Sequence, residues 1–150
     1  MKLFRKTILA MGAVMILTSF QSVPVENTFS LTIKVDELRN SKGVVQFALY
    51  NRDGTITDEN FKHYYKMGTS DIDNGSAILI FSNLPPGRYA VNILHDENEN
   101  GKIDKGLVLP KEGIGFSNYE TINLLNRPKF SKASFELNKD STKLIKIIYM

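Results

Sequence analysis

The sequence predicts an all-β protein, an antiparallel β-sandwich of about seven strands. Three observations predict this fold class. Apolar and polar residues alternate through several short segments, turn signals such as Asn74-Gly75 and Pro85-Pro86-Gly87 separate those segments, and no solenoid-type repeat is visible. The 150 residues have room for one domain, and a hydrophobic content of 42% excludes a disordered composition.

Residues 1–22 are predicted to form a secretory signal peptide. A basic start with Lys2, Arg5 and Lys6 is followed by an apolar core over residues 7–20 and then by polar residues. Cleavage near residue 22 would leave one β-sandwich domain over residues 23–150. The alternative is an uncleaved membrane anchor, but a spanning helix needs about 20 predominantly apolar residues. We therefore expect an exported protein of the periplasm, cell envelope or extracellular medium, with no membrane span after cleavage.

Charge and cysteine content exclude several classes of function. The chain has 19 basic and 16 acidic residues, but three of the basic ones and no acidic one lie in the predicted signal peptide. The exported part is therefore neutral, and it has no cluster of basic and aromatic residues that would bind nucleic acid. The absence of cysteine excludes a disulfide scaffold, a cysteine-ligated metal and a thiol nucleophile.

The predicted strands follow one another from residue 29 to the end of the chain. In Phe29–Val35 the apolar side chains occupy alternate positions, as expected of a strand with one buried face. The continuous apolar run Ala77–Phe81 predicts a strand buried on both faces. Residues 58–67 could form a helical turn. The other predicted strands are 45–49, 89–94, 133–137 and 145–149.

One loop carries residues typical of a calcium site. Oxygen-bearing side chains stand at alternate positions from the first, Asp96, and a glycine stands at the sixth, as in an EF-hand-type calcium loop. Calcium takes six to eight oxygen ligands, and the glycine permits the reversal that turns a backbone carbonyl toward the ion. An apolar residue, Ile103, could then anchor the loop in the core. The predicted ligands are Asp96, Asn98, Asn100, the Lys102 carbonyl and Asp104.

The pattern departs from an EF-hand at its end. The twelfth position is Leu107, where an EF-hand has a bidentate Glu, and a strand rather than a helix is expected to enter the loop. Glu112, five residues further on, is the predicted additional ligand, with water as the alternative. The expected affinity is weak, on the order of 10⁻⁴–10⁻³ M, as in extracellular modules. The other interpretations are a solvated Asn-Gly hairpin turn without metal and, fitting less well, an octahedral magnesium site.

The glycine-rich segment Pro110–Asn118 permits a sharp fold of the backbone. It is either an ordinary loop or a cover that folds over the metal loop and donates Glu112 or Asn118.

Two catalytic hypotheses use the same region. His95, Asp96 and Ser117 are residue types of a nucleophilic triad, although the sequence has no nucleophile-elbow motif. Glu112 with Asp96 or Asp104 could form a glycosidase pair. His95 is more simply interpreted as continuing the buried face of the strand 89–94.

Four motifs resemble a known bacterial family. The segment Leu84–Tyr89, which overlaps the first motif, resembles the L-P-P-G-x-Y turn of transthyretin-like (prealbumin-like) sandwiches, which implies an Ig-like arrangement of strands. The chain as a whole resembles a family of small secreted proteins catalogued as a domain of unknown function, which implies a β-sandwich of the cell envelope with no assigned activity. Leu109 stands where that family has a glycine. The motifs are Gly87–Ala90, His95–Asp104 (H-D-x-N-x-N-G-x-x-D), Leu109–Asn118 (P-x-E-G-x-G-F-S-N) and Pro128–Ala133.

Together these features predict an exported, non-enzymatic β-sandwich module of the bacterial cell envelope. A structural calcium ion would order the region 95–118 into a surface that binds an envelope protein or a glycan. The alternative is a carbohydrate-active or other hydrolytic enzyme that uses Glu112 with the loop carboxylates. No nucleic-acid partner is expected.

Overall fold

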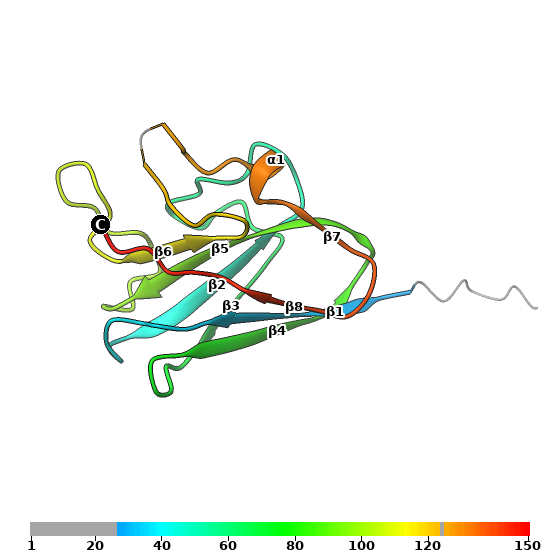
Figure 1. Ribbon diagram of the computed structural model, residues 1–150, viewed down its shortest axis with the longest axis horizontal. Helices are drawn as coiled ribbons and strands as arrows, with labels where there is room; N and C mark the ends of the chain where they lie inside the picture. Colours follow the sequence, from blue (N-terminus) through cyan, green and yellow to red (C-terminus); the bar gives the residue numbers. More distant parts are fainter. Residues whose placement is uncertain (1–26, 124) are drawn as a thin grey trace, which may run out of the picture.

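The computed structural model describes residues 27–123 and 125–150, which form two packed β-sheets (Figure 1). The predicted β-sandwich is therefore confirmed. The predicted signal peptide, residues 1–22, lies outside the described residues. Within the described part of the chain, no helix is long and apolar enough to cross a membrane.

The smaller sheet consists of β1 (Phe29–Val35), β4 (Ala77–Leu84) and β8 (Ser141–Leu144), in the order β4-β1-β8. A short helix, α1 (Phe130–Ala133), precedes the last strand of the larger sheet. The order in that sheet is β3-β2-β5-β6, with β7 also paired to β5. Its strands are β2 (Val44–Tyr50), β3 (Lys66–Ser70), β5 (Gly87–Asp96), β6 (Gly113–Phe116) and β7 (Phe135–Leu137).

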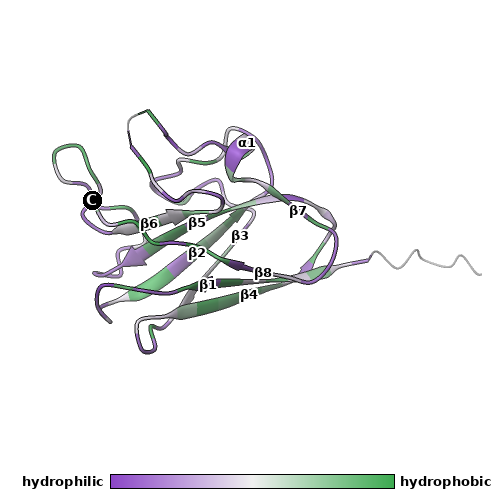
Figure 2. Ribbon diagram, viewed as in Figure 1, coloured by the Kyte–Doolittle hydropathy of each residue, from purple (hydrophilic) through white to green (hydrophobic). Residues whose placement is uncertain are grey.

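The main core lies between the two sheets. Alternate residues of β1 and β2, including Leu31, Ile33 and Phe47, are fully buried there, as the period-two pattern predicts. Val91 and Ile93 of β5 face the same core from the larger sheet. The apolar residues of Figure 2 accordingly concentrate along these strands, while most connecting loops are hydrophilic.

A second apolar cluster covers the outer face of the larger sheet. Ala48, Ala90 and Leu94 point to this side and pack with Phe61, Tyr119 and other residues of the loops and of α1. These loops and α1, which together form the outer layer of the sandwich, lie over the larger sheet in Figure 1. Because both of its faces are covered, β5 is buried without interruption from Tyr89 to Asp96.

Among residues 27–123 and 125–150, no such layer covers the outer face of the smaller sheet. The prediction that residues 77–81 are buried on both faces is wrong, since Ile78 and Ile80 of β4 are 48% and 58% exposed. They pair with Lys34 and Thr32 of β1, so the face that they share is partly polar.

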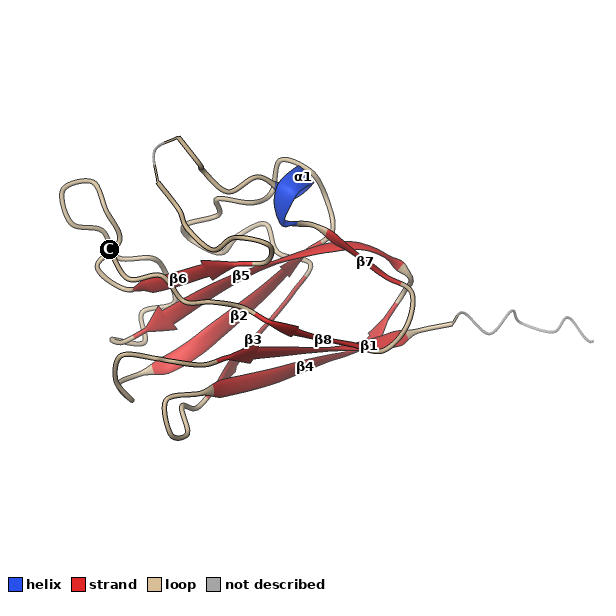
Figure 3. Ribbon diagram, viewed as in Figure 1, coloured by secondary structure: helices blue, strands red, loops and turns tan. Residues whose placement is uncertain are grey.

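Several elements differ from those predicted. The chain forms β3, β6 and β8, which were not predicted, and no helix between residues 58 and 67 (Figure 3). The expected strand 133–137 is divided between the end of α1 and β7. The expected strand 145–149 makes only one bridge, between Ile148 and Ile114, because β8 ends before it. β8 pairs with β1 in parallel, so the sandwich is not wholly antiparallel.

Candidate metal site

Asp96, the first predicted ligand, ends β5 and is 2% exposed. The entry of the loop packs closely against Gly43, just before β2. Gly43 has a φ of +65°, and a Cβ built on it would lie 1.9 Å from the Asp96 carbonyl oxygen. Only glycine fits both requirements, so the start of β2 fixes where the predicted metal loop leaves the sheet.

The loop is folded by hydrogen bonds from its own backbone. The Asp96 carboxylate accepts the N–H of Asn100 at 3.1 Å and that of Gly101 at 2.7 Å. Asn98 Oδ1 accepts the Asn100 N–H at 3.1 Å, and Asn100 Oδ1 accepts the Lys102 N–H at 3.0 Å. Gly101 has a φ of +75°, which permits the predicted reversal.

Three of the predicted ligands meet at one carboxylate oxygen. Asp104 Oδ2 accepts Asn98 Nδ2 at 2.7 Å and Asn100 Nδ2 at 2.9 Å. Ile103, the predicted anchor, is partly buried against the second apolar cluster, and its N–H donates to the Glu59 carbonyl at 3.0 Å. The loop is thus held at the outer layer of the sandwich with its polar side chains turned toward Asp104.

Glu112 closes this arrangement from the start of β6. It is 5% exposed, and its two oxygens accept the backbone N–H groups of Glu97 at 3.0 Å and Asp104 at 3.2 Å. Burial raises the pKa of this carboxyl, the two N–H donors lower it, and the charges of Asp96 and Asp104 raise it. The segment 110–118 therefore folds against the predicted metal loop and brings Glu112 to it.

Asn118, the other candidate in that segment, lies elsewhere. Its Nδ2 donates to the carbonyl oxygens of Lys132, Ala133 and Ser134 at 3.1 Å each, at the end of α1. Asn118 therefore holds the outer layer together and does not reach the loop.

The positive charges of this region do not neutralise the buried carboxylates. Arg39 forms its ion pair with Glu97 and donates to the Lys111 carbonyl at 3.0 Å. Among the described residues, Asp96, Asp104 and Glu112 form no ion pair. An open cavity of about 380 Å³ adjoins them, lined by Arg39, Lys42, Glu97, Asn98, Asp104, Lys111 and Glu112.

The carboxylates are not gathered as a ready-made metal site. Within residues 27–123 and 125–150, no three His, Cys, Asp or Glu side chains are close enough together to hold a metal ion. Both oxygens of Asp96 and of Glu112 face backbone N–H groups, and the amide nitrogens of Asn98 and Asn100 face Asp104. Calcium coordination would require these side chains to turn their oxygens to a common centre.

The residues of the triad hypothesis have structural partners. The ring of His95 is fully buried, with Nδ1 2.8 Å from Tyr149 Oη and Nε2 3.0 Å from the Lys42 carbonyl oxygen. Ser117 Oγ donates to the Ala133 carbonyl at 2.7 Å and accepts the Val91 N–H at 2.9 Å. In the described chain no hydrogen bond joins Ser117 to His95, and both side chains connect separate segments of the sandwich.

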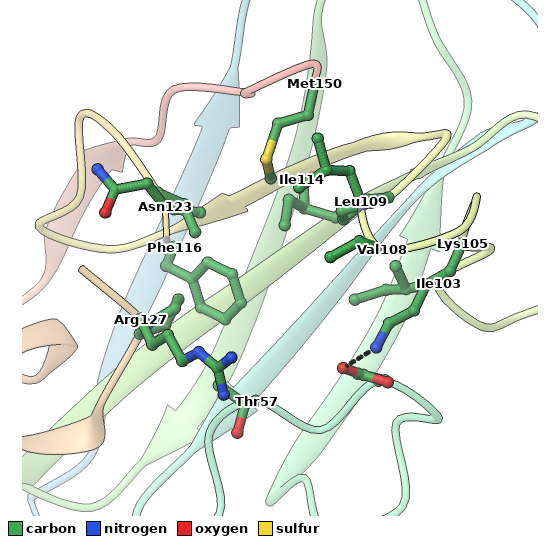
Figure 4. A pocket seen from close by; sticks show the side chains of 14 residues that line it. Thr57, Ile103, Lys105, Val108, Leu109, Ile114, Phe116, Asn123, Arg127 and Met150 are labelled. Atoms are coloured by element: carbon green, nitrogen blue, oxygen red, sulfur yellow. Dashed lines mark hydrogen bonds and ion pairs between the residues drawn. The ribbon is translucent and has the colours of Figure 1, made fainter. Parts of the chain in front are cut away.

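A second cavity lies on the outer layer and was not predicted. Its volume is about 300 Å³, and Figure 4 shows Ile114 and Phe116 beside Ile103, Val108 and Leu109. Polar residues lie at its margin, among them Arg127 and the ion pair of Lys105 with Glu59. The run Leu107-Val108-Leu109, unusual in a loop, was the signal available in the sequence.

A β-sandwich with an acidic loop between β5 and β6 defines a class of small all-β module. Within that class, a family model described as "Uncharacterized protein conserved in bacteria (DUF2141)" matches residues 33–145, and the chain belongs to this family. The resemblance to a bacterial family of unknown function is thereby confirmed. No curated protein and no solved structure matches the chain.

Proposed function

We propose that the chain is an exported, non-enzymatic module of the bacterial cell envelope whose loop Asp96–Asp104 binds a calcium ion. One observation carries the metal proposal: Asp96 and Glu112 are buried carboxylates without a cationic partner among the described residues. Buried charges in proteins are generally paired or coordinate metals, because an unpaired ion loses its hydration without compensation.

The ligands that calcium would use are already neighbours in the loop. Asp104 would exchange the amide N–H groups of Asn98 and Asn100 for the ion, and both amides would turn their oxygens inward. Asp96, the Lys102 carbonyl and Glu112 would complete a shell of six oxygens, within the range that calcium accepts. Because Glu112 also contacts both ends of the loop, a bound ion would fix the loop relative to β6.

The role that we assign to the ion is structural. Calcium would order the region 95–118 into a fixed surface that binds a partner of the envelope. Export is supported by the basic start and apolar core of residues 1–22 and by the absence of cysteine, which suits a protein that forgoes disulfides.

A calcium titration followed by side-chain amide NMR tests the proposal. The Nδ2 signals of Asn98 and Asn100 should move with a midpoint on the order of 10⁻⁴–10⁻³ M, since both groups leave Asp104. The amide of Asn126 is the internal control, because it donates to the Thr121 carbonyl at 2.8 Å outside the region 95–118 and should not move. Absence of any change at ~10 mM calcium, well above the expected dissociation constant, would refute the metal site.

One observation favours the hydrolytic alternative: burial and neighbouring carboxylates raise the pKa of Glu112, as in catalytic acids. Glu112→Gln separates the two functions. Loss of calcium binding alone supports the module. Positive glycan hydrolysis by the native protein that this substitution abolishes would support the enzyme.

A further inference from the structure

An apolar hairpin projects from the outer layer between the metal loop and β6. Its base is closed by a bridge between Lys105 and Pro110, and its turn by the Gly106 N–H donating to the Leu109 carbonyl at 2.8 Å. At the tip Leu107 is fully exposed, and Val108 and Leu109 are 66% and 49% exposed. Figure 2 shows this hydrophobic tip at the upper left.

Other apolar side chains extend the same side of the molecule. Leu125 is fully exposed on the loop before α1, which projects from the same side of the larger sheet as the hairpin in Figure 1. Met150 lies beside Leu109 (Figure 4) and is also exposed. The cavity of about 300 Å³ lies at the base of the hairpin.

Basic residues lie beside the base of this hairpin. A shallow hollow beside the tip is lined by residues 106–111 and Met150. The basic residues that line this hollow and the cavity are Lys105, Lys111 and Arg127, and the acidic residue that lines them is Glu59. The side chains of Lys111 and Arg127 form no ion pair within the described chain. Lys111 and Arg127 thus form a basic rim beside the projecting apolar tip.

We infer that this face docks onto an anionic lipid bilayer, with Leu107, Val108 and Leu109 inserted among the acyl chains and the basic rim at the headgroups. Charge complementarity selects this partner, because basic residues beside an apolar surface are attracted to anionic lipids. The shape of the hairpin agrees with this partner, since a projecting tip led by the fully exposed Leu107 can enter a lipid layer without a preformed pocket.

The calcium dependence of this docking rests on the proposed calcium site. The hairpin lies between two predicted calcium ligands, Asp104 and Glu112. Next to the bridge at its base, the Lys111 N–H donates to the Asp104 carbonyl at 2.8 Å. Without metal, the carboxylates of Asp96, Asp104 and Glu112 would repel anionic headgroups, whereas a bound divalent cation would offset them. Calcium is therefore expected to strengthen the docking.

A single fluorescent reporter tests the insertion directly. The sequence contains no tryptophan, so Leu107→Trp in the chain from residue 23 places the only indole at the tip. Leu144→Trp is the matched control, an exposed leucine on β8 of the smaller sheet. The emission of Leu107→Trp should shift to the blue with phosphatidylcholine vesicles that contain phosphatidylglycerol, in millimolar calcium, and brominated acyl chains should quench it. Leu144→Trp should show neither effect.

Co-sedimentation of the chain from residue 23, without the added tryptophan, measures the affinity for the vesicles. Leu107→Asn should weaken binding to the anionic vesicles roughly tenfold, equivalent to about 1.4 kcal/mol. Lys111→Gln should weaken it about fivefold. Leu144→Asn should leave it unchanged.

Several results would contradict the docking onto lipid or its calcium dependence. No shift for Leu107→Trp on anionic vesicles, or an equal shift on phosphatidylcholine alone, would overturn the inference. A shift without vesicles that grows with protein concentration would overturn it in favour of a second copy of the chain. Insertion that is the same in chelator would uphold the lipid surface and overturn its calcium dependence. The metal site itself is tested by the NMR titration, which contains no lipid.

Discussion

The Glu112 carboxylate accepts the backbone N–H of Asp104 at 3.2 Å, and this contact joins the start of β6 to the end of the acidic loop. The other oxygen of Glu112 holds the N–H of Glu97 at the beginning of that loop. One buried side chain therefore fixes both ends of the predicted calcium site. The chemistry of the site can be tested through this residue.

Glu112 should make the stability of the metal-free protein depend on pH. Burial raises the pKa of Glu112 above its usual value despite the two backbone N–H donors, and nearby carboxylates add to the increase, so the folded state binds the proton more tightly. Its stabilising contribution is full below the unfolded-state pKa and is lost as the pH rises through the folded-state pKa. In chelator, the unfolding free energy of the native protein relative to Glu112→Gln should therefore fall from acidic pH toward neutrality. Urea unfolding at a series of pH values measures this difference, and an increase with pH would contradict it.

Gly43→Ala should destabilise the protein by about 2–4 kcal/mol. Residue 43 has a left-handed backbone, which disfavours alanine, and the new Cβ would also clash with the Asp96 carbonyl oxygen, 1.9 Å away. Gly54→Ala is the matched control, because Gly54 has a φ of +75° but nothing within 4 Å of its added Cβ. It should cost only about 1–2 kcal/mol from the backbone conformation. Equal losses in denaturant unfolding would show that the contact with Asp96 is unimportant.

Ser117→Ala should lower the unfolding free energy by about 2–3 kcal/mol. Its buried hydroxyl connects the Val91 N–H with the Ala133 carbonyl, and alanine would leave both groups unsatisfied. Ser82→Ala, at an exposed position of β4, provides the comparison and should change stability little. A hydrolase screen on the native protein accompanies the unfolding experiment. Activity lost in a stably folded Ser117→Ala would instead make Ser117 a nucleophile.

The strands with one buried face could be predicted from their alternation, since burial repeats every two residues along β1. The exposure of Ile78 and Ile80 could not, because it depends on whether another layer covers the smaller sheet. In the part of the chain that the structure describes, that layer is built from loops and α1 and lies on the larger sheet. The sequence of an apolar strand is the same whether one or both of its faces are covered by other parts of the chain.

β6 was missed for a different reason. Gly113 and Gly115 resemble loop residues, but they are needed because the C-terminal segment crosses them. A Cβ on Gly113 would lie 2.4 Å from the Tyr149 ring, and one on Gly115 would lie 2.6 Å from the Lys146 carbonyl oxygen. Such an approach between segments distant in sequence leaves no local periodic pattern.

The candidate site was predictable in its composition but not in its hydrogen bonds. The spacing from Asp96 to Asp104 identified residues that do converge, and the segment 110–118 does bring Glu112 to them. The orientation of the Asn98 and Asn100 amides depends on competition between backbone N–H groups and the Asp104 carboxylate. Spacing alone cannot determine the result of that competition.

Thermal unfolding of the chain from residue 23, in ~10 mM calcium and in chelator, tests the metal site most directly. Binding to the folded state alone at 10 to 100 times the dissociation constant stabilises by about 1.4–2.7 kcal/mol, a rise of several degrees in the midpoint. The rise should disappear in Asp96→Ala and shrink in Asp104→Asn, and it should persist in Asp71→Ala, which removes an exposed carboxylate outside the loop. An unchanged midpoint in the native protein, or an equal rise in Asp96→Ala, would contradict calcium binding by this loop.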